Sequence, residues 1–162
     1  MKEVYLALGA NVGDAAGNIA KAISLLAACL QEVKQAPLYR SKPAGYAGQP
    51  DFVNSVIRGQ TGLSPEELFS FVKQVEQQVG RVERFRWGPR EIDIDIIFYG
   101  DQIIKSSKLT IPHPRFAERD FVLKPLADLD PNLKDPLSGK TIGQLLAAVG
   151  NLTDLQPLGP LN

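Results

Sequence analysis

The sequence predicts an α+β fold with a ferredoxin-like βαββαβ core, in which a mainly antiparallel sheet carries helices packed on it. Three observations support this prediction. Apolar residues recur at helical spacing in separate segments, short apolar strand-like runs stand between those segments, and Gly- and Pro-rich stretches divide the elements. No repeat or linker interrupts the 162 residues, so we expect residues 1–162 to form a single domain.

The first predicted unit is a strand followed by a helix. Residues 4–8 are apolar and end at Gly9, which is typical of a buried strand. The helix is indicated by apolar residues spaced three and four apart, namely Ile19, Ile23, Leu26 and Leu30. A second strand is expected over residues 33–40, and Pro37 would confine it to an edge or a bulge.

The next elements are a loop, a strand and the helix with the strongest signals. Residues 41–51 hold two prolines and two glycines, which indicates a loop, and residues 52–58 return as a strand. A helix is predicted over Pro65–Val79, because Ser64 and Glu67 form a capping box. Its apolar face consists of Leu68, Phe71, Val72, Val75 and Val79, and Gly80 should end it.

The last predicted elements are a strand, a hairpin and a helix. Residues 92–99 form a strand, and Gly100 and Asp101 suggest a hairpin turn into residues 102–104. A second capping box, from Thr141 and Gln144, begins the final helix. Its buried stripe consists of Ile142, Leu145, Leu146 and Val149, and Gly150 ends it.

Composition restricts the class of protein. Eighteen basic residues balance eighteen acidic ones, whereas a broad nucleic-acid surface is usually basic, so we expect no nucleic-acid partner. The single cysteine, Cys29, excludes an internal disulfide and fits a reducing compartment. No apolar run approaches the roughly 18 residues that span a bilayer, and the N-terminus lacks a signal peptide's apolar region. We therefore expect a cytoplasmic protein, monomeric and without a membrane partner.

Two aspartates within an isoleucine-rich strand are the first functional signal. Strand side chains alternate between faces, so Asp93 and Asp95 should point the same way, about 6.6 Å apart at the backbone. Two carboxylates on one face repel each other, and a hard divalent cation such as Mg²⁺ would relieve that repulsion. A half-exposed strand with a polar outer face is the alternative interpretation.

Arginines just upstream strengthen the metal interpretation. They are Arg81, Arg84, Arg86 and Arg90. Guanidinium groups bind phosphate in a bidentate manner, and phosphoryl transfer depends on positioning and on neutralising spread-out negative charge. The pattern therefore predicts a phosphoryl-transfer site, whereas a lattice of Arg–Asp salt bridges is the alternative. The glycine-rich stretch of residues 9–14 is not a Walker A motif, because it lacks the G-K-[ST] ending.

Four blocks of the sequence carry a resemblance to a known family, namely YLALGANVGD, YRSKPAGYAGQPDFVNSV, EQQVGRVERFRWGPREIDIDIIFYG and LTIPHPRFAERDFVLKPL. In their order and spacing they resemble the 6-hydroxymethyl-7,8-dihydropterin pyrophosphokinases of folate biosynthesis. The resemblance implies transfer of the β,γ-pyrophosphoryl group of ATP to the hydroxymethyl group of a reduced pterin, with release of AMP. It also implies two Mg²⁺ ions on the pair that matches Asp93 and Asp95.

The resemblance also assigns individual residues. Those matching Arg81 and Arg90 are catalytic, and Asp95 is our candidate for the general base. The pterin would be bound by residues matching Ser41, Lys42, Pro43, Ala44, Phe52, Asn54 and Phe121. ATP would be bound by residues matching Glu76, Arg84, Trp87, Ile96, Thr110, His113 and Arg119. A flat ring with amide-like edges fits aromatic faces and an asparagine at the rim.

Two other classes of protein are compatible with parts of the pattern. A magnesium-dependent nucleotidyltransferase also uses two carboxylates on a strand, but it attacks the α-phosphorus and releases pyrophosphate. A ferredoxin-like RNA-binding module would need exposed aromatic residues on its central strands, where this sequence places Asp93 and Asp95.

Overall fold

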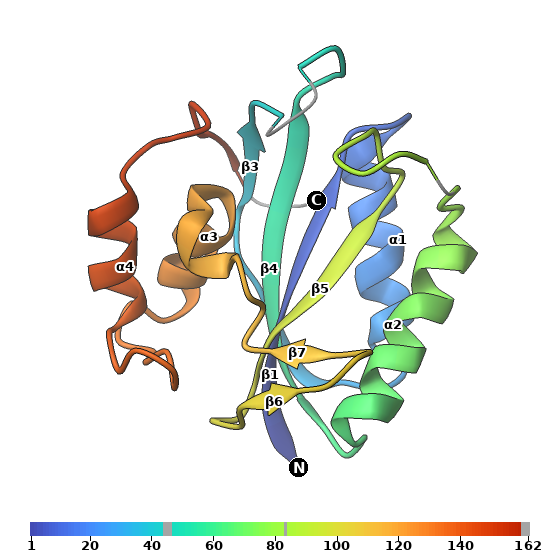
Figure 1. Cartoon of the computed structure of the whole chain (residues 1–162). Helices are drawn as coiled ribbons and strands as arrows, with labels where there is room; N and C mark the ends of the chain where they lie inside the picture. The colour runs from blue at the N-terminus through green and yellow to red at the C-terminus, as the bar shows by residue number, and fades with distance from the viewer. Residues whose placement is uncertain (44–46, 83, 160–162) are drawn as a thin grey trace.

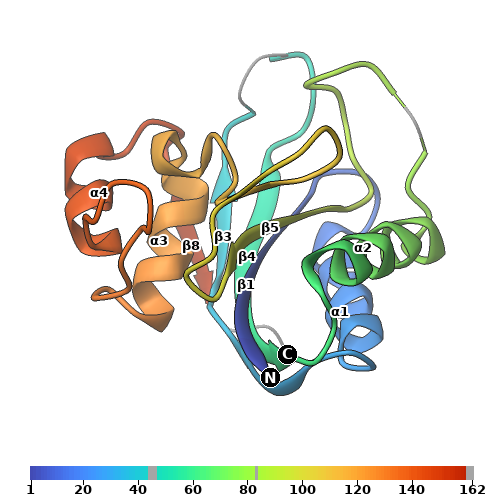
Figure 2. The same cartoon turned by 60° about the horizontal axis from the view of Figure 1, so that its bottom comes forward.

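A computed structural model describes residues 1–43, 47–82 and 84–159. The chain forms an antiparallel sheet with helices on both faces (Figures 1 and 2). In chain order, the elements are β1 (Lys2–Ala10), α1 (Ala15–Leu26), β2 (Gln31–Gln35), β3 (Leu38–Ser41), β4 (Phe52–Thr61), α2 (Pro65–Val79), β5 (Asp93–Tyr99), β6 (Ile104–Lys105), β7 (Thr110–Ile111), a 3-10 turn (Phe116–Glu118), α3 (Asp120–Leu129), α4 (Ile142–Val149) and β8 (Gln156–Gly159).

The sheet has the order β5-β1-β4-β3-β8, and β2 also pairs with β4. The first strand lies between β4 and β5 and is antiparallel to both, with Gly9 opposite Asn54 on one side and Asp93 on the other. This arrangement is the predicted ferredoxin-like α+β core, extended by β8 at one edge. It brings the ends of three strands together at Gly9, although these residues are far apart in the sequence.

Two separate cores lie on the two faces of the sheet. Helices α1 and α2 cover one face, and α3 and α4 cover the other (Figures 1 and 2). The α1/α2 side buries Leu6, Ile19, Leu68 and Ile94, whereas the α3/α4 side buries Phe98 and Leu126 among others. None of the helices in the described part of the chain combines the length and apolarity that crossing a membrane requires.

Capping signals placed the ends of α2 and of α4 correctly, whereas α1 ends at Leu26 and leaves Leu30 of the predicted stripe outside it. The Ser64 side chain accepts a hydrogen bond from the Glu67 N–H, the Glu67 carboxylate accepts one from the Ser64 N–H, and Gly80 ends α2 with a φ of 116°. The same reciprocal capping by Thr141 and Gln144 begins α4. Both helices therefore begin where the capping boxes predicted.

Two strand predictions were wrong in detail. The strand expected over residues 33–40 is divided into β2 and β3 around Pro37, which has no N–H to donate to a ladder. The chain turns at Gly100, whose φ is 53°, but β6 then pairs with β7 instead of returning along β5. Helix α3 was not predicted, because its first residue follows a position without a side-chain cap and Pro125 lies inside it.

Candidate active site

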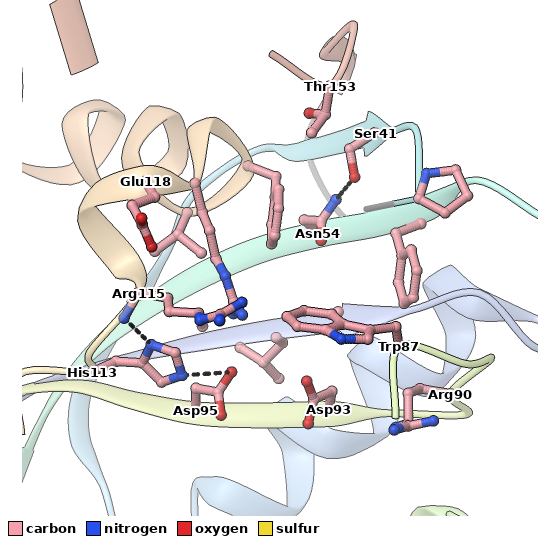
Figure 3. Close-up of a pocket in the computed structure, with 18 of the residues that line it drawn as sticks. Ser41, Asn54, Trp87, Arg90, Asp93, Asp95, His113, Arg115, Glu118 and Thr153 are labelled. Carbon is pink, nitrogen blue, oxygen red and sulfur yellow. Dashed lines mark hydrogen bonds and ion pairs between the residues drawn. The ribbon is translucent and has the colours of Figure 1, made fainter. Parts of the chain in front are cut away.

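A cleft of about 790 Å³ opens on the α3 side of the sheet (Figure 3). Besides Leu152 and Thr153, five parts of the chain line it. These are the end of β1, the β3–β4 region, the α2–β5 loop (residues 80–82 and 84–92), strand β5, and the segment from His113 into α3. Leu152 and Thr153 close one side. Most of the cleft therefore depends on contacts between segments that are distant in the sequence.

The two aspartates of β5 point into this cleft together, as their spacing predicted (Figure 3). Ile94, between them, belongs to the core on the opposite face. The exposed fractions of the Asp93 and Asp95 side chains are 41% and 32%, so both can reach a ligand. The alternating burial of β5 thus fixes a carboxylate pair on a rigid strand.

The environment of Asp95 disfavours its charged form. Burial within the cleft, together with the nearby Asp93 carboxylate, raises the pKa of Asp95 to about 7. A cation bound beside both carboxylates would reverse this effect, because it would favour the two deprotonated forms. The raised pKa is therefore the electrostatic mark of a site suited to a cation.

His113 contributes a neutral ring next to Asp95. Its Nδ1 accepts a hydrogen bond from the Arg115 N–H at 3.1 Å, so the single proton of the neutral ring lies on Nε2. Nε2 is 3.8 Å from Asp95 Oδ2. Burial and the Arg119 guanidinium lower the pKa of His113 to about 4, which keeps the ring neutral at pH 7. His113 thus offers an N–H donor to the base of the cleft.

Arg81 is oriented by a buried carboxylate. Its Nη1 donates to Glu76 Oε2 at 2.7 Å and to Asp93 Oδ1 at 3.1 Å. Glu76 is 2% exposed and also accepts from the Ile94 N–H at 2.9 Å. Glu76 therefore links α2, Arg81 and β5. A lattice of Arg–Asp salt bridges was the alternative interpretation of this segment. Among the described residues between positions 81 and 95, Arg81–Asp93 is the one such pair.

The lone tryptophan lies within cation–π distance of two arginines. The guanidinium carbons of Arg86 and Arg115 are each 5.0 Å from the Trp87 ring. Arg119 lies over the Phe121 ring at 5.7 Å. These contacts place cationic groups and aromatic faces side by side, which suits a ligand with both phosphates and a flat ring.

Arg90 is fixed through Asn11, a residue that sequence reasoning did not select. Asn11 Oδ1 accepts from the Arg90 N–H at 2.8 Å, and the Asn11 N–H donates to the Arg90 carbonyl at 2.9 Å. The Asn11 amide also donates to Gln49 Oε1 and to the Pro50 carbonyl. The Arg90 guanidinium donates to the carbonyl groups of Phe85, Gly88 and Pro89. One buried amide thus links β1, the β3–β4 loop and the α2–β5 loop.

The other end of the cleft has an asparagine and two phenylalanines. Asn54 is 4% exposed, and its Nδ2 donates to Ser41 Oγ at 2.7 Å (Figure 3). A Cβ on Gly9 would lie 3.2 Å from Asn54 Oδ1, so the glycine leaves the amide oxygen room. Phe52, two residues from Asn54 on β4, lines the same cleft, as does Phe121. The side chains predicted to bind a flat ring are therefore together.

The structure brings most of the predicted residues to the cleft, but not all. Arg81, Arg90 and Asp95 line it, as do the ring-site residues Ser41, Lys42, Pro43, Phe52, Asn54 and Phe121, and the nucleotide-site residues Trp87, His113 and Arg119. Ala44 lies outside the described residues. Four residues predicted to contact ATP are not in the lining, namely Glu76, Arg84, Ile96 and Thr110.

These four residues have other surroundings. Glu76 supports Arg81, and Ile96 packs in the α1/α2-side core. Arg84 forms two hydrogen bonds of 2.6 Å with the Glu91 carboxylate. Thr110 is half-buried on β7. Lining residues that the sequence did not suggest include Arg115, Glu118, Leu152 and Thr153.

The donor set fits a divalent cation only with help from a substrate. No group of three or more His, Cys, Asp or Glu side chains suited to a metal occurs among the described residues. Asp93 and Asp95 supply two carboxylates, and Mg²⁺ is commonly held by one or two carboxylates plus substrate phosphates and water. The pair therefore suits magnesium that arrives with a polyphosphate.

A carboxylate pair near several arginines, on an antiparallel sheet, suits the class of enzymes that act on a polyphosphate substrate. The comparisons identify the family. Residues 5–131 match the family model described as 7,8-dihydro-6-hydroxymethylpterin-pyrophosphokinase (HPPK). The chain therefore belongs to this family, and it is an enzyme of the diphosphotransferase class.

Individual relatives agree with this assignment. The chain is 46% identical to the 2-amino-4-hydroxy-6-hydroxymethyldihydropteridine pyrophosphokinase of Aquifex aeolicus, over 88% of this chain and 89% of the relative. It is 42% identical to the protein of that name from Synechocystis, over 94% of this chain and 78% of the relative. Membership of this family does not favour the two alternative classes, a nucleotidyltransferase and an RNA-binding module.

Solved structures support the fold alone. A Plasmodium falciparum HPPK-DHPS triple mutant matches with a TM-score of 0.76 at 15% identity, covering 96% of this chain and 46% of the solved one. The chain thus spans about half the length of that protein. The α+β sheet with helices on it is the shared part.

Proposed function

We propose that this protein transfers the pyrophosphoryl group of ATP to the hydroxymethyl group of 6-hydroxymethyl-7,8-dihydropterin, giving AMP and the pterin diphosphate. Family membership and the names of its relatives support this reaction. The composition of the cleft links the proposed reaction to particular residues. The cleft holds a carboxylate pair and cationic side chains at one end, and an asparagine with two phenylalanines at the other.

The reduced pterin occupies the end near Asn54. The Asn54 amide binds the amide-like edge of the ring, and Phe52 and Phe121 contact its faces, with Ser41, Lys42, Pro43 and Ala44 beside it. Ser41 already accepts a hydrogen bond from Asn54, which orients the amide. This arrangement discriminates against rings without a matching donor and acceptor edge, because a buried amide would then lose partners.

ATP lies toward β5 with its phosphates between the arginines and the carboxylates. Two Mg²⁺ ions held by Asp93 and Asp95 supply charge neutralisation and alignment of the triphosphate when bound. Trp87, His113 and Arg119 contact the nucleotide from the cleft wall. For Arg84, Ile96 and Thr110, which do not line the cleft, the sequence resemblance is the support for a contact with ATP. Glu76 acts through Arg81, whose guanidinium it holds.

Arg81 and Arg90 stabilise the charge that develops on the transferred group. Before substrate arrives, Glu76 holds the Arg81 guanidinium and Asn11 holds the Arg90 backbone. The carbonyl groups of Phe85, Gly88 and Pro89 accept from the Arg90 guanidinium. Asp95, next to the neutral His113, is the candidate acceptor for the hydroxymethyl proton.

The chain works as a single domain of residues 1–162, as a cytoplasmic monomer whose partners are these small molecules. The single cysteine supports a reducing compartment, and the balanced charge supports the lack of a nucleic-acid partner. Size-exclusion chromatography with light scattering, and fractionation of cells, test it.

Product analysis tests the reaction. The protein is incubated with ATP, Mg²⁺ and the reduced pterin alcohol, and the nucleotide products are separated. AMP is the expected product, whereas pyrophosphate release would indicate nucleotidyl transfer. Asp95→Ala should abolish turnover without unfolding the protein, as checked by circular dichroism. Full activity of that variant would contradict the assigned site.

A further inference from the structure

The C-terminal segment is held against the cleft by one buried carboxylate. Asp120, in the first turn of α3, is 1% exposed. Its Oδ2 accepts from the Thr153 N–H at 2.9 Å, and its Oδ1 accepts from the Thr153 hydroxyl at 2.7 Å. Both carboxylate oxygens are therefore used by a residue 33 positions further along the chain. Such a pair of charge-assisted bonds fixes the position of the segment.

The same segment continues the contact to the ring end of the cleft. The Thr153 carbonyl accepts from the Lys42 N–H at 2.8 Å. Lys42 stands between Ser41, the hydrogen-bond partner of Asn54, and Pro43. Figure 3 shows Thr153 beside Ser41, at the Asn54 end of the cleft. Asp120, Thr153 and Lys42 thus form a continuous chain of contacts between α3 and the β3–β4 region.

The position of Leu152 gives this chain a further consequence. Leu152 lines the cleft, yet 68% of it is exposed. An apolar side chain held at the mouth of a cleft loses solvent contact only when a ligand covers it. Residues 152 and 153 also lie beyond residues 5–131, which match the family model, so family membership assigns them nothing.

We propose that Asp120 is a positioning residue for the pterin site, and that Leu152, held in place through Thr153, forms one wall against the pterin ring. This inference rests on the proposed function. Asp120 itself does not line the cleft. Its hydrogen bonds lead to the ring end of the cleft, through Thr153 to the Lys42 backbone and to Leu152.

The chain supplies a matched control for the buried carboxylate. Asp135 is 4% exposed and accepts from the Leu137 and Ser138 N–H groups and from the Ser138 hydroxyl. It does not line the cleft. Asp135→Asn therefore removes the same kind of buried charge, with comparable structural cost, at a distance from the substrate site. If the pterin KM differs between the two variants, the cause is the location of Asp120 beside the substrate site and not the loss of a buried charge as such.

The test compares Asp120→Asn, Asp135→Asn and Leu152→Ala with the parent protein in AMP formation. Asp120→Asn should raise the KM for the pterin about tenfold, as expected for a lost charge-assisted hydrogen bond. Leu152→Ala should raise it about fivefold through lost apolar contact. The KM for ATP should stay unchanged in both variants, and Asp135→Asn should change neither constant.

A second measurement does not need turnover. In amide hydrogen exchange, the Lys42 N–H should exchange faster in Asp120→Asn than in the parent and in Asp135→Asn. Equal exchange at Lys42, equal pterin KM in the two Asp→Asn variants, or a joint rise of both KM values would each overturn the inference. If Asp120→Asn does not fold, Leu152→Ala still tests the inference, because Leu152 is exposed and its replacement should not unfold the protein. An unchanged pterin KM in Leu152→Ala would then overturn the inference. A parent protein that forms no AMP refutes the proposed function, and the exchange at Lys42 then still decides whether Asp120 holds this segment.

Discussion

Two hydrogen bonds join Asn11 and Arg90. The backbone N–H of Asn11 donates to the Arg90 carbonyl, and the Asn11 side-chain oxygen accepts from the Arg90 N–H. The Nδ2 group of Asn11 donates to Gln49 Oε1 and to the Pro50 carbonyl, and so holds the loop at these two residues. A residue that does not line the cleft therefore holds the loop before β5 in place.

Removing the Asn11 amide should loosen this loop. Asn11→Ala leaves the Arg90 N–H without its partner, and we expect the free energy of unfolding to fall by about 2 kcal/mol. Turnover should fall as well, because Arg90 loses its orientation. Urea denaturation and steady-state kinetics measure the two effects. Asn11→Asp keeps the acceptor for Arg90 but loses the amide donors, so its effect on turnover should be smaller. Equal turnover in both variants would argue against this role.

Arg90→Ala should separate catalysis from binding. If the guanidinium stabilises charge only in the transition state, kcat falls about a hundredfold while the KM for the pterin changes little. Initial rates over a grid of both substrates provide the values. Equal loss in kcat and in pterin affinity would contradict a transition-state role.

Glu76→Gln should harm both stability and turnover. Arg81 would lose the buried charge that holds it, and we expect a loss of about 2 kcal/mol in unfolding free energy. Lys73 pairs with the same carboxylate from a more exposed position, at 3.1 Å. Lys73→Met is therefore the control, with an expected effect of about 0.5 kcal/mol or less. A larger effect from Lys73→Met than from Glu76→Gln would show that the buried pair is not the important one.

Asp95 should make the metal-free protein less stable at alkaline pH. Its folded-state pKa is raised to about 7, so its favourable contribution is complete below the unfolded pKa near 3.8 and is lost as the pH rises through 7. At pH 8 without Mg²⁺, Asp95→Asn should be more stable than the parent by about 1 to 2 kcal/mol, a value reduced for partial exposure. Thermal unfolding from pH 4 to pH 8 should show this advantage shrinking as the pH falls. A constant difference would refute the raised pKa.

The Arg84–Glu91 pair predicts the opposite pH dependence. Arg84 lowers the pKa of the Glu91 carboxyl from 4.5 to about 2, so the stability from this pair is present above about pH 4.5 and is lost as the pH falls toward 2. The parent should be more stable than Arg84→Ala at pH 7, and the difference should disappear near pH 2. The KM for ATP of this variant also tests whether Arg84 reaches the nucleotide.

The sequence predicted features that depend on local geometry. Alternation along β5 placed Asp93 and Asp95 on one face, and the Ser64–Glu67 box fixed the start of α2. The fold followed, because the main predicted strands and helices entered the ferredoxin-like order, whereas the strand expected after Gly100 pairs with β7 in a separate two-stranded sheet.

The features that it missed depend on contacts across long sequence separations. Asn11 bonds to Arg90 across 79 positions, and Thr153 bonds to Asp120 across 33. A local pattern carries no information about such partners. The resemblance brought most site residues together, but it did not show that Glu76 lies behind Arg81 instead of in the cleft lining.

The location of Trp87 has a practical consequence. It is the single tryptophan of the chain, and it lies on the cleft wall within cation–π distance of Arg86 and Arg115. Its indole emission is therefore a built-in optical reporter, and quenching upon addition of a colourless nucleotide analogue would follow occupancy in real time without any attached dye.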